Sequence, residues 1–406
     1  MSRHPMRRKL ASTLFVVLAV MAAAPTTLVA QDEPEKIVVI GDVHGDYNNF
    51  VQVLQDTGIV DRRLRWQAGK SRLVQLGDVS DRGPDTRKIV ELLTKLARQA
   101  SRRKGAVYVL IGNHEAMNMQ GDLRYVHPGE YAAFIDRDSE RRRDRYYEIS
   151  IEHIKSHTPE EEWPVFDAAH REEWNKRFPL GYVEHRLAWA PTGEIGKWVL
   201  ENHTVLVLDG TLFVHAGLTS DYASYSASDI NTRVRTELAA PERLGDDAIV
   251  NVPDGPLWTR NASASAETAA QLANIQRVLD AFGAKRMVVG HTPSLGTVFP
   301  RFGGRVIVAD VGLSSYYGGS LAALEIDGDT LTLIHNGERI PLPTDDAGVE
   351  EYLQQVKPLV PEPARIDNYL ESRAADAAAE AAAKAAAEVA AEIDEVAEDA
   401  AAAEQQ

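Results

Sequence analysis

Three short motifs rich in aspartate and histidine follow one another at near-equal intervals in the first third of the chain. They are Gly41-Asp42-Val43-His44-Gly45, Gly77-Asp78-Val79-Ser80-Asp81-Arg82-Gly83 and Gly112-Asn113-His114-Glu115. Two further histidines, His215 and His291, precede turns of small residues later in the chain. Carboxylate, imidazole and amide oxygen without thiolate suit Mn, Fe or Zn, whereas an all-oxygen set would favour Mg or Ca. The residue types therefore predict a transition-metal site.

The recurrence of such motifs is typical of a two-metal phosphoesterase. Two ions about 3.5–4 Å apart clamp the attacking and leaving oxygens of a phosphoryl transfer, and they make hydroxide available near neutral pH. A carboxylate with two free oxygens can bridge them. Without cations Asp42, Asp78 and Asp81 would repel one another, so we expect metal binding that depends on pH.

Strands must position these residues. Short apolar runs at 37–40, 73–76 and 106–111 end at the three motifs, and similar runs precede His215 and His291. Such runs are typical of strands buried in a parallel sheet, whose carboxyl ends meet in one crevice. We therefore expect the motif side chains to share one site.

Further apolar runs predict a second sheet. They lie at 205–208, 321–326 and 330–335, and Asp327-Gly328-Asp329 is a hairpin turn between the last two. Residues 31–370 suffice for one large domain. Neither a phosphate-binding glycine loop nor a dinucleotide fingerprint is present.

All five motifs, in order between residues 41 and 292, resemble those of the calcineurin-like metallophosphoesterases of the phosphoprotein phosphatase superfamily. Three stretches are most similar to the bacterial Shewanella-like protein phosphatases: Gly121-Asp122-Leu123-Arg124-Tyr125-Val126, Gly290-His291-Thr292-Pro293-Ser294 and Ser314-Ser315-Tyr316-Tyr317-Gly318-Gly319. The resemblance implies an α/β fold of two facing mixed β-sheets flanked by helices, with a helical cap insertion.

The resemblance also assigns metal ligands. One ion would be held by Asp42, His44 and Asp78. Asp78 would bridge to a second ion held by Asn113, His215 and His291. The cofactors implied are two divalent or trivalent transition-metal ions, Mn, Fe or Zn, with Mn favoured.

Roles in catalysis and substrate binding follow from the same resemblance. His114 would protonate the leaving oxygen, and Asp81 would hold its other ring nitrogen. Arg82 and Asn113 would bind the phosphoryl group. The guanidinium of Arg82 is well suited to this, because it presents a planar fork of donors. Arg260 is the candidate for a second such arginine, with a surface arginine beside a structural tryptophan as the alternative.

Two features have open interpretations. The family tyrosine near the metals has no clear equivalent; Tyr316 or Tyr317 could serve, or could simply pack. Asp310 could support His291 or cap a turn.

About one hundred residues separate Asn113 from His215, roughly twice the number in compact members of the family. We assign 122–200 to an inserted helical cap with helices at 143–157 and 160–177. Its mixed charges indicate a solvated helix face, and a lid whose arginines attract phosphorylated substrate is the alternative. Its tryptophans are expected to form the core of a small subdomain: Trp163, Trp174, Trp189 and Trp198.

The first thirty residues have the order of a secretory signal. Basic residues precede an apolar stretch at 10–24, and small residues lead to a cleavage site near Ala30. The apolar stretch is shorter than the ~20 residues that span a bilayer. We expect a periplasmic or secreted protein with no stable membrane insertion after cleavage of 1–30; an uncleaved anchor is the alternative.

Composition excludes several classes. The chain has no cysteine, which excludes disulfides, lipoprotein acylation and a cysteine-nucleophile tyrosine phosphatase. Its net charge of −16 argues against binding nucleic acid through a basic face.

Residues 371–406 form a low-complexity tail rich in alanine and glutamate. Alanine and glutamate favour helix, but few large apolar residues are present to anchor it. We expect a partly helical, solvent-exposed tail in which Val389, Ile393 and Val396 could support weak self-association.

The sequence favours a metal-dependent phosphatase that hydrolyses phosphomonoesters by attack of a metal-bridging hydroxide. Its expected substrate is a phosphorylated protein or peptide, with serine, threonine or tyrosine left open. The first alternative is a hydrolase of small phosphoesters or dinucleoside polyphosphates. The second is a non-catalytic metal-binding scaffold, against which the intact set of catalytic residues argues.

Overall fold

The computed structural model describes residues 35–403, without the side chains of 380, 388 and 390–403. The expected signal segment 1–30 and its cleavage position Ala30 lie outside the described residues. Within 35–403, the helices are all too short or too polar to cross a bilayer.

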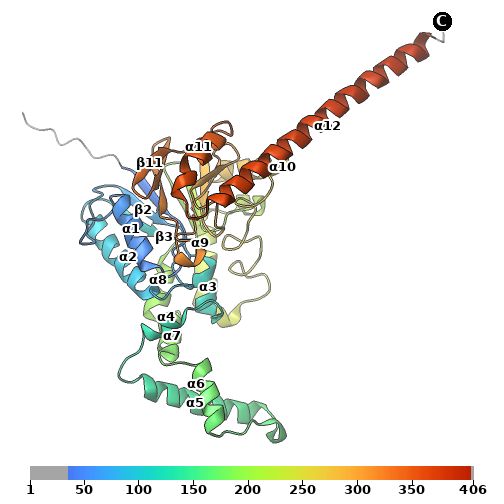
Figure 1. The fold of residues 1–406 in the computed structure, drawn as a ribbon. Helices are drawn as coiled ribbons and strands as arrows, with labels where there is room; N and C mark the ends of the chain where they lie inside the picture. The colour runs from blue at the N-terminus through green and yellow to red at the C-terminus, as the bar shows by residue number, and fades with distance from the viewer. Residues whose placement is uncertain (1–34, 404–406) are drawn as a thin grey trace, which may run out of the picture. The chain divides into compact units, whose positions relative to one another are not determined.

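The strands of the described residues form two mixed sheets (Figure 1). Their bounds are β1 Ile37–Ile40, β2 Arg72–Gln75, β3 Ala106–Val109, β4 Val205–Leu208, β5 Thr211–Val214, β6 Arg286–Val289, β7 Phe299–Arg301, β8 Val306–Val308, β9 Ala322–Asp327, β10 Thr330–His335 and β11 Glu338–Pro341. The first sheet has the order β11-β10-β9-β1-β2-β3, and the second has the order β4-β5-β6-β8-β7.

Helices connect and flank these strands. Their bounds are α1 Tyr47–Asp56, α2 Thr86–Ser101, α3 Asn113–Gln120, α4 Pro128–Ala132, α5 Ser139–His157, α6 Ala168–Arg177, α7 Tyr182–Trp189, α8 Glu194–Glu201, α9 Ala227–Ala239, α10 Ala269–Ala281, α11 Val349–Val356 and α12 Pro363–Ala403. Figure 1 shows α1 and α2 together beside the first sheet, and α2 packs on β3.

Parallel pairing places the motifs at one edge of each sheet. In the first sheet β1 pairs with β2 and β2 with β3 in parallel; in the second, β5, β6 and β8 do the same. One hydrophobic core contains residues of both sheets, among them Val39, Phe213 and Ile307, each fully buried. The expected α/β fold of two mixed sheets and the hairpin at 327–330 are confirmed. The runs at 321–326 and 330–335, expected in the second sheet, instead extend the first sheet, because β9 pairs with β1.

The segment expected to form the cap divides between two cores. The rings of Tyr146, Trp174, Phe178 and Tyr182 contact one another and hold α5, α6 and the start of α7 together. Trp189 is fully buried in the main core instead, as are Ile195 and Val199 of α8. The expectation that all four tryptophans form a subdomain core is therefore wrong for Trp189, and for Trp198, which also packs on the main core.

The expected helix over 160–177 is interrupted. A single turn at Glu160–Glu162 precedes an extended Trp163, and α6 begins only after Asp167, whose carboxylate accepts a hydrogen bond from the amide of His170. Pro164 explains the break, because proline lacks an amide hydrogen and disfavours helical geometry in the residue before it. The helix expected at 143–157 is present and starts earlier, at Ser139.

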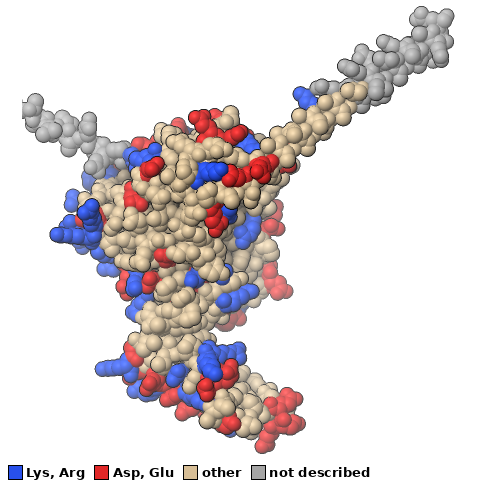
Figure 2. Space-filling model, viewed as in Figure 1, with Lys and Arg blue, Asp and Glu red and all other residues tan. Residues whose placement is uncertain are grey.

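The charges of the cap helices pair with one another. Arg142 contacts Asp136 and Glu184, Arg145 contacts Glu148, and Arg171 bonds to Asp144. On the face shown in Figure 2, basic and acidic side chains are interspersed over α5 and α6. These pairings support the solvated-face interpretation.

The tail continues a helix anchored on the body. Ile366, in the first turns of α12, is fully buried, and Tyr369 and Leu370 pack against the core. The boundary expected at 371 therefore falls inside α12. Val389 is 56 % exposed, whereas the side chains of Ile393 and Val396 lie outside the described ones.

A buried acid lies where the cap segment meets the loop after β2. Glu130 of α4 is 2 % exposed, and its carboxylate accepts hydrogen bonds from the Thr86 hydroxyl and from the backbone amide of Asp81. His185 of α7 lies 3.9 Å from it and is fully buried. Burial raises the pKa of Glu130 to about 8, because the hydrogen bonds only partly offset the loss of hydration.

Glu130→Gln should change how stability depends on pH. A carboxyl group whose pKa rises from 4.5 in the unfolded chain to about 8 in the fold makes the protein less stable as pH rises across that interval. Relative to the variant, the wild type should lose about 1 kcal/mol or more of unfolding free energy between pH 5 and pH 8. Urea denaturation of both proteins at each pH measures this, and an equal difference at both pH values would contradict the assignment.

Candidate metal centre

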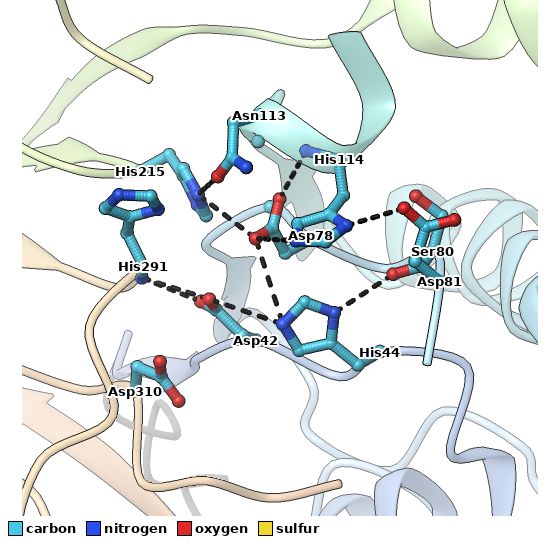
Figure 3. A network of polar contacts seen from close by, with 12 residues as sticks. Asp42, His44, Asp78, Ser80, Asp81, Asn113, His114, His215, His291 and Asp310 are labelled. Carbon is cyan, nitrogen blue, oxygen red and sulfur yellow. Dashed lines mark hydrogen bonds and ion pairs between the residues drawn. The ribbon is translucent and has the colours of Figure 1, made fainter. Parts of the chain in front are cut away.

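The predicted site residues meet at the carboxyl ends of strands from both sheets (Figure 3). Asp42 and His44 follow β1, Asp78 and Asp81 follow β2, and Asn113 and His114 begin α3 after β3. His215 follows β5 and His291 follows β6. Every one of these side chains is at least nine-tenths buried.

Asp78 belongs to two groups of potential metal ligands. Its Oδ2 lies 3.4 Å from Nε2 of His215 and 3.8 Å from Nε2 of His44. On one side Asp78, His44 and His114 form a compact donor group, and the His44 ring also lies 3.9 Å from Oδ2 of Asp42. On the other, the His215 ring lies 3.0 Å from Oδ1 of Asn113, and Asp78, His215 and His291 form one compact donor group. A carboxylate shared by both groups is the geometry of a bridging ligand.

Backbone carbonyls orient the imidazoles. Nδ1 of His44 contacts the Ser80 carbonyl at 3.0 Å, and Nδ1 of His215 contacts the Leu76 carbonyl at 2.8 Å. Since a carbonyl can only accept, Nδ1 carries a hydrogen in each ring, and Nε2 is the ring nitrogen that faces Asp78. His291 is turned the other way, because its Nε2 contacts the Trp258 carbonyl at 3.2 Å. Nε2 of His44, Nε2 of His215 and Nδ1 of His291 are therefore the nitrogens that would face a bound metal.

Glycines before the ligand residues give room to carboxylates from other motifs. A Cβ atom on Gly112 would lie 2.1 Å from Oδ1 of Asp78, and one on Gly290 would lie 2.3 Å from Oδ1 of Asp42. Amides one or two residues after these glycines donate hydrogen bonds to the same carboxylates. The His114 amide donates to Asp78 at 2.9 Å, and the His291 amide donates to Asp42 at 3.0 Å. Each motif thus fixes the carboxylate of another.

Backbone strain concentrates at this centre. His44, Asp78, Asp81, Arg82 and His291 all have positive φ, between 47° and 71°. Such conformations cost about 1–3 kcal/mol each and persist only where surrounding contacts enforce them. The strain turns the side chains inward at the strand ends.

Glu115 provides much of that enforcement. Its buried carboxylate accepts hydrogen bonds from the amides of Asp78, Val79, Ser80 and Gly112 at 2.8–3.1 Å, and from the Ser80 hydroxyl. One side chain therefore satisfies successive donors of the strained loop after β2. Glu115 belongs to the third sequence motif, but its role depends on contacts with the second motif that a local pattern does not reveal.

Electrostatics at the centre favour bound cations. Burial raises the pKa of Asp42 well above its ordinary value, and the charges of Asp310 and Asp78 add to the effect. Burial also raises the pKa of Asp310 to about 6. Burial lowers the pKa of His44 and of His291 to about 3, so both rings are neutral ligands at neutral pH. Buried acids beside neutral imidazoles and an amide oxygen form a donor set that fits two transition-metal ions.

His114 and Asp81 form a second buried pair beside Asp78. Nδ1 of His114 lies 2.6 Å from Oδ2 of Asp81, and Asn118 donates to the other Asp81 oxygen at 2.9 Å. Nε2 of His114 lies 3.9 Å from Oδ2 of Asp78. Burial by itself lowers the pKa of His114, but the charge of Asp78 and the Asp81 hydrogen bond outweigh it and raise this pKa. The arrangement suits a proton donor.

Arg82 lies among tyrosines next to this pair. Its guanidinium lies 3.9 Å from the centre of the Tyr125 ring and 4.8 Å from that of Tyr316. Among the described residues, its buried Nε has no hydrogen-bond partner. Tyr317 packs against the His44 ring. The unpaired donor is consistent with the predicted binding of a phosphoryl oxygen.

Arg260 and Asp310 also lie at the centre. Nη1 of Arg260 donates to Oγ1 of Thr292 at 2.9 Å and to the carbonyl of His291 at 3.4 Å, so Arg260 lies beside the second ligand group. The Asp310 carboxyl group forms a hydrogen bond with the carboxyl group of Asp42 and accepts another from the amide of Gly312. Its contact to the first ligand group could not be inferred from a strand-end position alone.

Comparison with known proteins agrees with this geometry. Residues 35–295 match the model of the calcineurin-like phosphoesterase family. An uncharacterised protein of Schizosaccharomyces pombe is 34% identical over 72% of this chain and 77% of its own length. Shewanella-like protein phosphatase 2 of Arabidopsis thaliana is 31% identical over 70% of this chain and 72% of its own length.

A solved structure also matches. It is the cold-active protein-tyrosine phosphatase of a psychrophilic Shewanella species, which covers 76% of this chain and 80% of its own, with 26% identity and a TM-score of 0.56. The family match, the two mixed sheets and the paired buried donor groups agree with one another. The chain belongs to the calcineurin-like phosphoesterase family and is related to the Shewanella-like protein phosphatases.

Proposed function

We propose that this protein is a metal-dependent phosphatase that hydrolyses phosphomonoesters on proteins or peptides. The observation that carries the proposal is that Asp78 is shared between two ligand groups and that the His114–Asp81 pair lies directly beside it. A scaffold that only bound metals would not need a buried, oriented proton donor. The names of the Arabidopsis and Shewanella relatives support protein phosphatase activity.

The residues divide the chemistry among them. One metal ion would be held by Asp42, His44 and Asp78, and a second by Asp78, Asn113, His215 and His291. Bound there, the two ions would polarise the phosphoryl oxygens and supply a nucleophilic water near neutral pH.

The remaining side chains bind the substrate and move a proton. Arg82 would bind phosphoryl oxygens through its unpaired Nε and the rest of its planar fork. As the bond from phosphorus to the leaving oxygen breaks, Nε2 of His114 would give that oxygen its proton. Asp81 would hold the His114 ring in the orientation that this transfer needs, and Asn118 would hold Asp81 in place.

The ligand types support Mn, Fe or Zn, with Mn as our preferred assignment. The signal-like order of residues 1–30 supports a periplasmic or secreted location.

The substrate class is tested by direct comparison. Metal-reconstituted mature protein is assayed on a phosphotyrosine peptide, a phosphoserine peptide and diadenosine tetraphosphate. We expect kcat/KM to be highest on one of the phosphopeptides. A higher value on diadenosine tetraphosphate would favour a polyphosphate hydrolase, and inactivity on all three in metal-loaded protein would favour a scaffold.

His114→Asn should affect substrates unequally. p-Nitrophenyl phosphate has a leaving group that hardly needs a proton, whereas an alkyl phosphate needs one, so kcat on the alkyl ester should fall about 10²-fold or more. The loss on p-nitrophenyl phosphate should be much smaller, with metal content unchanged. His153→Asn, in the exposed part of α5, is the control. Equal losses on both esters would remove His114 as the acid.

Asp78→Asn should deplete both ions, because Asp78 belongs to both ligand groups. Metal content per protein, measured by mass spectrometry after gel filtration, should fall well below that of the wild type. Asp85→Asn changes a nearby carboxylate that pairs with Lys88 at the surface, and it should keep its metal. A wild-type ratio in Asp78→Asn would argue against the bridging assignment.

A further inference from the structure

A cavity of about 390 Å³ opens beside the second ligand group. His291 forms part of its wall, and so does Met117, whose sulfur lies next to the Asn113 amide. The cavity therefore borders the metal centre at the second ligand group. A substrate whose phosphoryl group occupied the centre would place neighbouring groups within reach of it.

Two arginines make the wall of this cavity positively charged. Arg124 follows α3, and Arg260 comes from the segment after Trp258; both line it, with Asp122 as the acid in the lining. The chain as a whole carries a net charge of −16, so a wall with two guanidinium groups against one carboxylate contrasts with the rest of the protein. The walls are linked across the cavity by Gln120 and Asn251, whose side-chain amides exchange two hydrogen bonds.

The side chain of Arg124 is held by an ion pair but remains accessible to a ligand. Its guanidinium pairs with Asp122 through both carboxylate oxygens, and its side chain is 66 % exposed. Exposed pairs of this kind contribute little to stability, so an incoming carboxylate can share or replace Asp122 at small cost. A planar guanidinium binds a carboxylate or phosphate through two parallel hydrogen bonds.

We propose that this cavity is a specificity subsite, which binds an acidic side chain adjacent to the phosphorylated residue of the substrate, with Arg124 as its main recognition group. The proposal rests on the proposed function and narrows its substrate class to phosphopeptides with acidic neighbours. Arg260 would contribute from the boundary between the cavity and the metal centre. In an extended peptide successive residues are about 3.3–3.6 Å apart, so a residue next to the phosphorylated one stays close to the centre, which Arg260 borders through its contact with the His291 carbonyl.

The test compares two matched phosphopeptides. One has glutamates on both sides of the phosphorylated residue, and the other has glutamines at the same positions. The wild type should prefer the acidic peptide by about fivefold in kcat/KM, chiefly through KM, as expected for about 1 kcal/mol of screened attraction. Raising the ionic strength should reduce this preference.

Substitutions of opposite sign separate recognition from structure. Arg124→Gln should bring the preference close to one and leave the kinetics on p-nitrophenyl phosphate unchanged. Asp122→Asn should increase the preference, because it removes the carboxylate that competes for Arg124. Arg65→Gln is the matched control: Arg65 also pairs with a nearby acid, Asp61, but lies outside the cavity, and this variant should keep the wild-type preference.

Several outcomes would overturn the proposal. They are equal rates on the two peptides in the wild type, an undiminished preference in Arg124→Gln, and a parallel loss on p-nitrophenyl phosphate. A loss in Arg124→Gln confined to diadenosine tetraphosphate would assign the cavity to a polyphosphate chain instead. If metal-loaded wild type hydrolysed neither peptide, the proposed function itself would fail, which is visible before any preference is compared.

Discussion

The burial of Asp78 between the two sheets is the constraint on which the rest of the centre depends. A carboxylate removed from water is costly unless opposite charges and hydrogen-bond donors surround it. Here the His114 amide and the ring of His215 supply both, so the first and second sheets are tied through one side chain. The proposed metal bridge, the proton donor and the phosphoryl site are all defined by their position relative to it.

That constraint is maintained by backbone features with little chemistry of their own. Gly112 and Gly290 admit carboxylates that any larger residue would displace, and Glu115 satisfies the amides of a loop whose residues have positive φ. Each strained residue costs about 1–3 kcal/mol, which the surrounding contacts must exceed. The glycine that opens each motif is therefore as necessary to the geometry as the ligand that follows it.

The cap segment contributes to the centre at its base. Glu130 reaches the Asp81 amide from α4, and the backbone of Arg82 donates to the carbonyl of Tyr125. Residues of the expected cap thus support the loop that carries Asp81 and Arg82, the proposed partners of His114 and of the phosphoryl group. Arg124, from the same stretch, lines the cavity beside the second ligand group. Residues 122–200 are the part of the chain that is hardest to interpret from sequence. They support the site through Glu130 and Tyr125, and they supply Arg124 to the proposed specificity subsite.

The sequence by itself determined most of the strands and the convergence of the motif residues, because short apolar runs ending in Asp, Asn or His encode both burial and position. It did not determine the strand order, since the runs at 321–326 and 330–335 were expected in the second sheet and join β1 in the first. It also predicted the Asp81–His114 pair through the family resemblance. Only the tertiary structure decided the roles of Glu115, Glu130 and Asn118 and the contact of Asp310 with Asp42. It also showed that Trp189 belongs to the main core and that Arg124 and Arg260 line one cavity. These outcomes depend on contacts between segments far apart in the chain. A local pattern of polar and apolar residues does not specify which distant residue a buried group will contact.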